Sequence, residues 1–140
     1  ALRAGLAAGV IGAICSDHQP HEPDAKQAPF GDTEPGISGL DTLLALSLRL
    51  ARDGVSPLSV IIDRLTHGPA QILGLDRGHL GMGALADLCI FDPDADWRLE
   101  PGSMHSRGRN SPFTGWELPG RVTHTLLEGR VIYAGGGGKE

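Results

Sequence analysis

The hydrophobic pattern divides the chain into a helical first part and a second part of short strands. Residues 10–16 form an apolar run without alternation, which is typical of a strand buried on both faces of a parallel sheet. Apolar residues at helical spacing predict helices over residues 2–9, 38–54 and 56–65. A fourth, short helix is predicted to follow, with Pro69 near its start. A long polar loop, residues 17–37, separates the predicted strand from the later helices.

Polar residues and glycines set the expected limits of these helices. Ser38 followed by Asp41 resembles a capping box, so we expect a helix to begin there. The last helix is expected to bury Ile72 and Leu73 and to end at Gly74.

After residue 75 the pattern changes to short strands separated by glycines. Residues 86–92 and 96–101 predict two strands, and residues 121–135 predict a β-hairpin with a tight turn at Glu128–Gly129. Residues 1–75 therefore resemble the closing unit of a parallel α/β barrel, and residues 76–134 a small β-domain beside it. The glycine-rich end, residues 135–140, predicts a flexible tail.

Composition narrows the class of protein. The chain has 140 residues, enough for one modest domain, and a net charge of −5 with 12 scattered basic residues, which argues against nucleic-acid binding. No apolar run approaches the roughly 20 residues that cross a bilayer, so no membrane association is expected. Cys15 and Cys89 lie in apolar runs, so we expect buried, reduced thiols and a cytoplasmic protein.

The first residues of the sequence indicate whether the chain begins a protein or continues one. There is no initiator methionine and no signal-peptide pattern, and residues 1–9 are typical of the end of a helix. We therefore expect the chain to be the C-terminal portion of a longer protein.

Candidate chemistry begins where the predicted strand ends. Asp17, His18 and His21 follow within five positions, and active sites of parallel α/β barrels lie at the carboxyl ends of strands. A carboxylate there can bind a divalent metal or act as a general base. The alternative is an Asp that caps the loop backbone beside structural histidines. A loop of about 20 residues is unusual inside a compact domain and favours the functional interpretation.

These residues also carry a family resemblance. The sequence SDHQPH (16–21) resembles the DHAPH motif of dihydroorotases, within the amidohydrolase superfamily. Four further segments resemble family motifs in the same order, namely KQAPFGDTEPGISGLDTLL, LTHGPAQILGL, GHLGMGALADLCIFDPDADW and SRGRNSPFTGWELPGRVTHTLLEGRVIY. The resemblance covers nearly all of residues 1–134. It implies an α/β fold, with residues 1–75 closing a (β/α)8 barrel and residues 76–134 belonging to a small β-sandwich domain.

The resemblance also implies roles for individual residues. Asp17 would be the metal-site aspartate and the general acid/base, and His21 would hold the substrate carboxylate. Pro35 and Gly36 would contact the dihydroorotate ring through their backbone. The cofactor would be zinc, one or two ions, with the remaining ligands outside this chain. His18, which points the other way in an extended backbone, is expected to be structural.

The implied activity is the reversible cyclisation of N-carbamoyl-L-aspartate to L-dihydroorotate in pyrimidine biosynthesis, by an oligomeric enzyme. His21 separates this pattern from those of hydantoinases and allantoinases, although another cyclic-amide hydrolase stays open. Gln19 departs from the family motif, which has Ala at that position. The main alternative is a non-catalytic dihydroorotase-like subunit that supports assembly of aspartate carbamoyltransferase.

Overall fold

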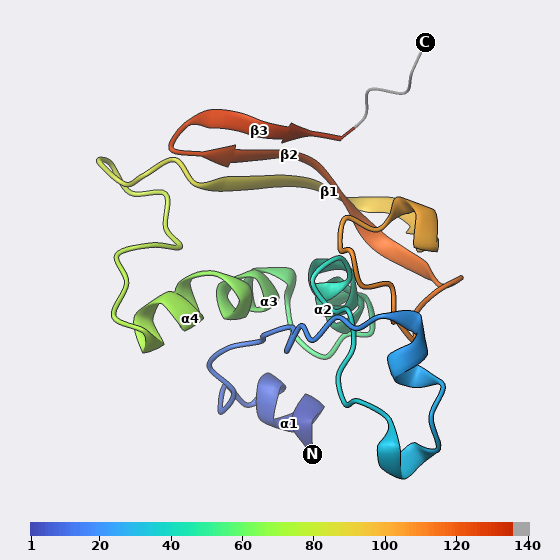
Figure 1. Cartoon of the computed structure of the whole chain (residues 1–140). Coiled ribbons are helices and arrows are strands. Elements are labelled where there is room, and N and C mark those ends of the chain that lie inside the picture. The colour runs from blue at the N-terminus through green and yellow to red at the C-terminus, as the bar shows by residue number, and fades with distance from the viewer. Residues whose placement is uncertain (136–140) are drawn as a thin grey trace.

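The computed structural model describes residues 1–135, in which helices underlie one face of a three-stranded sheet (Figure 1). The helices are α1 (Leu2–Ala7), α2 (Leu43–Arg52), α3 (Leu58–Leu65) and α4 (His67–Ile72). The strands are β1 (Leu88–Arg98), β2 (Glu117–Leu127) and β3 (Arg130–Ala134). Three short 3-10 turns complete the list, η1 (Pro23–Lys26), η2 (Phe30–Asp32) and η3 (Pro101–Ser103). Of the tail predicted at 135–140, residues 136–140 lie outside the described residues.

The sheet is antiparallel, in the order β1-β2-β3. β1 and β2 pair from Leu88 opposite Leu126 to Arg98 opposite Glu117, with irregularities in between. The two strands predicted at 86–92 and 96–101 are therefore one strand, since the pairing resumes after the interruption between Asp92 and Asp96. The predicted hairpin and its turn at residues 128–129 are confirmed.

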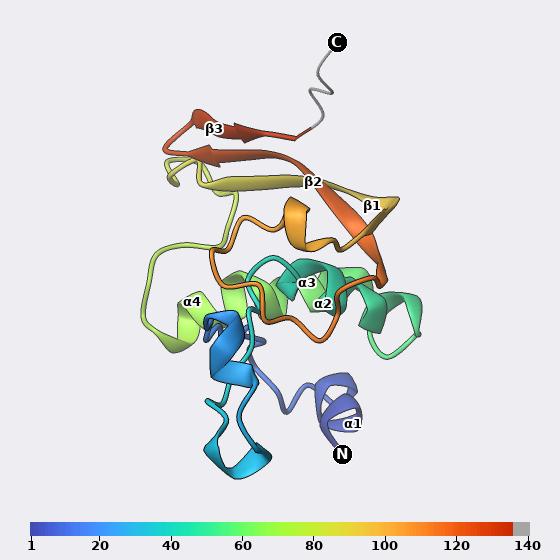
Figure 2. The same cartoon turned by 45° about the vertical axis from the view of Figure 1, so that its right-hand side comes forward.

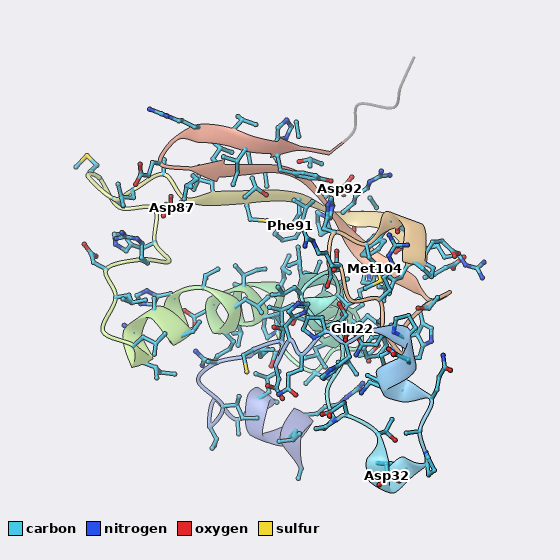
Figure 3. All side chains as sticks on the ribbon, in the orientation of Figure 1. Glu22, Asp32, Asp87, Phe91, Asp92 and Met104 are labelled. Carbon is cyan, nitrogen blue, oxygen red and sulfur yellow. The ribbon has the colours of Figure 1, made fainter. Side chains whose placement is uncertain are left out.

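A small core joins α2 to the sheet and its connecting segment. Ala45 of α2 is buried with Leu99, Met104 and Leu118. Leu99 and Leu118 are fully buried, and burial of each such side chain stabilises the fold by about 1.5–3 kcal/mol. Figure 3 shows Met104 close to α2, between the helices and the strands. The core therefore fixes the position of the segment between β1 and β2 against α2.

α2 begins later than predicted, at Leu43. The carboxylate of Asp41 does not cap the helix, because it accepts the backbone N–H groups of His105 at 2.8 Å and Ser106 at 3.3 Å. Ser38 is fully buried, and its hydroxyl has no hydrogen-bond partner among the described residues. The capping-box prediction was wrong because a distant segment takes the acidic side chain.

Two predictions of burial were also wrong. Ile72 and Leu73 are 66% and 70% exposed, since no described element covers that face of α4. Cys15 and Cys89 are free, as expected, but both are exposed. In the part of the chain that the structure describes, no helix is long and apolar enough to cross a membrane.

The strand predicted at residues 10–16 does not form. A strand buried in a parallel sheet needs partners beside it, and no described strand lies next to this segment. Its backbone is attached to α3 instead, where the N–H of Ile14 donates to the carbonyl of Arg64 at 2.8 Å. Among residues 1–135, parallel pairing is limited to one bridge just beyond the segment, between His18 and Ile37.

Candidate active site

Three segments distant in sequence meet at the end of the predicted strand, residues 17–21, 35–39 and 105–110. The N–H of Gln19 donates to the carbonyl of Ile37 at 2.8 Å, next to the His18–Ile37 bridge. The third segment is joined to the second where the N–H of Ser38 donates to the carbonyl of Asn110 at 3.1 Å. The loop between the first two segments extends away from the sheet (Figure 2), with Asp32 at its outer tip (Figure 3).

His18 orders the chain just before α2. Its Nδ1 accepts the backbone N–H groups of Gly39 at 3.1 Å and Leu40 at 3.2 Å. Because Nδ1 accepts both bonds, the ring is used for local backbone structure, the kind of role expected for it from the sequence.

The ring of His21 lies against Pro35, at the far end of the loop that begins at residue 17. Its Nε2 is 2.9 Å from the carbonyl oxygen of Pro35. A carbonyl only accepts, so Nε2 carries the proton in this contact and Nδ1 is left for another partner. The backbone N–H of His21 donates to Oδ1 of Asn110 at 2.9 Å. The ring is thus oriented by the loop and its backbone by the segment before β2.

Asp17 is exposed and has a left-handed backbone, with φ of 44°. That conformation costs a residue with a Cβ roughly 1 kcal/mol, and such strain concentrates at functional positions. The amide Nε2 of Gln19 donates to Oδ1 of Asp17 at 3.3 Å. Asp17 therefore presents its carboxylate to solvent, with one neighbouring donor.

Gly36 makes the loop fit against the first segment. Its φ is +100°, and a Cβ built there would lie 2.4 Å from Cβ of Gln19. The carbonyl of Gly36 accepts from Nζ of Lys26 at 2.8 Å and from Nδ2 of Asn110 at 3.3 Å. Only glycine combines this backbone with this approach.

The structure thus brings together three of the four predicted site residues, His21, Pro35 and Gly36. Asp17 is connected to them through Gln19, which touches both its carboxylate and the Gly36 turn. Among the described residues, no hydrogen bond joins Asp17 directly to His21.

Sequence reasoning missed two side chains that shape this site, Asn110 and Lys26. Both lie in segments that carry the family resemblance, RNSPF and KQAPF, so the signal was present. What it lacked was the pairing across 89 residues between His21 and Asn110.

Of the ligands expected for the predicted zinc site, this part of the chain contains one, Asp17. In residues 1–135, no group of three or more His, Cys, Asp or Glu side chains is arranged to hold a metal ion. Asp17 can supply a carboxylate ligand, but these residues do not make a complete site, so no chemical step is derived through a metal.

A separate cavity of about 820 Å³ lies between α2 and the sheet. His18, Asp41 and His105 line part of it, whereas Asp17, His21, Pro35 and Gly36 do not. The cavity is therefore adjacent to the candidate site and distinct from it.

Comparison with known proteins agrees with this fold. The model of the amidohydrolase family matches residues 1–132. The solved L-hydantoinase (dihydropyrimidinase) from Arthrobacter aurescens superposes with a TM-score of 0.88 at 28% identity, over 96% of this chain and 31% of that one. This likeness confirms the predicted fold class, an α/β portion of the amidohydrolase fold.

Two curated relatives are more similar in sequence. A dihydroorotase-like protein of Pseudomonas aeruginosa is 51% identical over 135 residues, which are 96% of this chain and 32% of that protein. A dihydroorotase of Geobacter sp. (strain M21) is 44% identical over 136 residues, 97% of this chain and 32% of that protein.

The chain thus spans about a third of the length of the curated relatives it matches, 32% in both cases. Within that third, the family match runs from the first residue to residue 132, in β3. On the fold and on this match, the chain belongs to the amidohydrolase family.

Proposed function

We propose that the protein containing this chain is a dihydroorotase, which interconverts L-dihydroorotate and N-carbamoyl-L-aspartate. The observation that carries the proposal is the cluster of His21, Pro35 and Gly36, joined by a 2.9 Å contact between the His21 ring and the Pro35 carbonyl. This cluster offers an imidazole for an anionic group and a turn with backbone groups for a cyclic amide. The relatives named dihydroorotase or dihydroorotase-like support the same substrate.

His21 suits the carboxylate of the substrate. A doubly protonated ring keeps the Nε2–H bond to Pro35 and donates its Nδ1–H to an anion. A charge-assisted hydrogen bond of that kind is roughly twice as strong as a neutral one.

Asp17 suits proton transfer because its carboxylate is exposed at the end of the segment that leads into the cluster. In hydrolysis it takes a proton from the attacking water and passes it to the ring nitrogen as the C–N bond breaks. In cyclisation the same proton moves in the opposite direction. Zinc, one or two ions held by Asp17 and by ligands outside residues 1–135, would supply Lewis-acid activation when bound.

The setting of the reaction is proposed from the same resemblance. Pyrimidine biosynthesis in the cytoplasm is the expected context, and an oligomeric enzyme is the expected form. Free rather than paired cysteines fit a reducing compartment.

The test uses the full-length protein as its gene encodes it. Dihydroorotate formation from carbamoyl aspartate is followed together with the zinc content per chain. The proposal expects turnover and at least one zinc per chain. Hydantoin and allantoin serve as competing substrates, and faster hydrolysis of either one would replace dihydroorotase by another cyclic amidohydrolase.

The alternative has a separate outcome in the same experiment. A protein with less than one zinc per chain and no turnover, which co-purifies with aspartate carbamoyltransferase, would be a non-catalytic dihydroorotase-like subunit. That result would reject the catalytic proposal.

A further inference from the structure

The side chain of Asn110 joins the two parts of the candidate site. Its Oδ1 accepts the backbone N–H of His21 at 2.9 Å. Its Nδ2 donates to the carbonyls of Gly36 at 3.3 Å and Gln19 at 3.4 Å. One amide thus contacts the segment that bears His21 and the turn that contains Gly36.

The backbone of residues 108–110 also packs closely against the candidate site. Its carbonyl accepts the N–H of Ser38 at 3.1 Å, just after the Gly36 turn. Two residues earlier, a Cβ on Gly108 would lie 2.4 Å from Cβ of Pro20 and 3.0 Å from the backbone nitrogen of His21. The segment therefore approaches residues 20–21 as closely as a backbone without a side chain allows.

The chemistry of these contacts requires an amide. The His21 partner is a donor, so it needs an acceptor, whereas both carbonyl partners need donors. An amide provides both kinds of group on one short side chain. A carboxylate of the same shape would keep the first contact and would turn an oxygen toward the two carbonyl oxygens.

The Gly36 carbonyl that accepts from Asn110 has a second donor, Lys26. Nζ of Lys26 donates to the Gly36 carbonyl at 2.8 Å and also contacts the Glu34 carbonyl. Lys26 belongs to the same loop, so it stabilises the turn locally. Asn110 differs because it fixes the turn relative to His21.

We infer that Asn110 is a positioning residue, which sets His21 and the Pro35–Gly36 turn at the separation required to hold the substrate. This inference rests on the proposed function of those residues as substrate contacts. Asn110 itself touches only protein groups, so its loss should weaken substrate binding more than it slows the chemical step.

The experiment compares Asn110→Ala and Asn110→Asp with the unmodified full-length protein. Thr114→Val is the matched control, because Thr114 lies in the same connection between β1 and β2 and, among the described residues, its hydroxyl donates to the nearby Ser111 carbonyl at 3.1 Å. Steady-state kinetics with dihydroorotate give KM and kcat separately. Hydrogen–deuterium exchange is measured on peptides covering residues 17–22 and 33–38, with the β2–β3 hairpin as the internal reference.

We expect both Asn110 variants to raise KM by about tenfold or more, with a much smaller change in kcat. Exchange should become faster in both loop peptides and stay unchanged in the hairpin. Thr114→Val should behave as the unmodified protein. Faster exchange in all peptides of Asn110→Ala would mean that this variant unfolds. The positioning role is then tested with Asn110→Asp, which preserves the volume of the side chain.

Two failures are distinguishable. If the unmodified protein turns over dihydroorotate and Asn110→Asp leaves KM unchanged, the positioning role is overturned and the proposed function stands. If the unmodified protein neither turns over nor binds dihydroorotate, the proposed function fails. Unchanged exchange in both loop peptides would overturn the positioning role in either case.

Discussion

The carboxylate of Asp41 accepts the backbone N–H of His105 at 2.8 Å, across 64 residues of sequence. The same carboxylate accepts the next N–H, that of Ser106. This pair of bonds anchors the start of the segment whose other end carries Asn110. The candidate site is therefore supported by Asp41, two residues before α2, as well as by the loop.

Asp41→Ala should lower the free energy of unfolding by about 1–3 kcal/mol, because two backbone donors lose their acceptor. Urea denaturation followed by circular dichroism measures the change. Asp94→Ala is the control, since the Asp94 side chain is exposed and accepts none of the described hydrogen bonds. Equal stability of the two variants would contradict the anchoring role.

Asp17→Asn in the full-length protein should reduce kcat for dihydroorotate by about 10² or more, because the proton carrier is removed. Asp32→Asn, at the exposed tip of the same loop, should leave turnover unchanged (Figure 3). Zinc content is measured for both variants, since loss of a ligand and loss of a base have the same effect on rate. Near-normal turnover of Asp17→Asn would remove Asp17 from the mechanism.

His21→Ala should mainly raise KM, since the ring is proposed to hold the substrate carboxylate. His79→Ala is matched to it, because the hydrogen bonds of the His79 ring to described residues are local, with Asp76 at 2.9 Å and with the N–H of Gly81 at 3.2 Å. Initial rates over a range of dihydroorotate concentrations separate the two effects. An unchanged KM would reject the role given to His21.

Gly36→Ala should destabilise the loop by roughly 1–2 kcal/mol and raise KM, because Ala at φ of +100° is strained and its Cβ collides with Gln19. Gly31→Ala in the same loop has open space around the new Cβ and should be neutral. Thermal unfolding and KM are compared between the two. Similar behaviour of both variants would show that the Gly36 turn is not required.

Cys89 should alkylate slowly at pH 8. Burial raises the pKa of the Cys89 thiol even though part of the side chain is exposed, so less thiolate is present at that pH. The pH profile of iodoacetamide labelling is followed on the peptide that contains Cys89 by mass spectrometry, and the midpoint should lie above that of a peptide thiol, about 8.5. A midpoint at or below the peptide value would contradict a desolvated thiol.

Sequence patterns predicted an element correctly where its formation depends on residues close to one another in the chain. The β2–β3 hairpin needs only adjacent residues, and its turn at 128–129 formed as expected. The apolar pattern of residues 38–54 likewise predicted a helix, which forms as α2, because helical spacing of apolar residues is a property of the segment itself.

Features that depend on distant partners were predicted less well. The apolar run at 10–16 has the composition of a buried strand, but a strand forms only beside other strands. The start of α2 moved because residues 105–106 take the Asp41 carboxylate. Asn110 was overlooked for the same reason, since nothing near it in sequence shows that its amide reaches residues 19–36.

The 89 residues between His21 and Asn110 also have a consequence for synthesis on the ribosome. A chain grows at roughly 5–20 residues per second, so the His21 segment leaves the ribosome about 4–18 s before Asn110 follows it. During that interval His21 and Gly36 lack the amide that joins them, and substrate affinity should appear only after the segment ahead of β2 has emerged and folded.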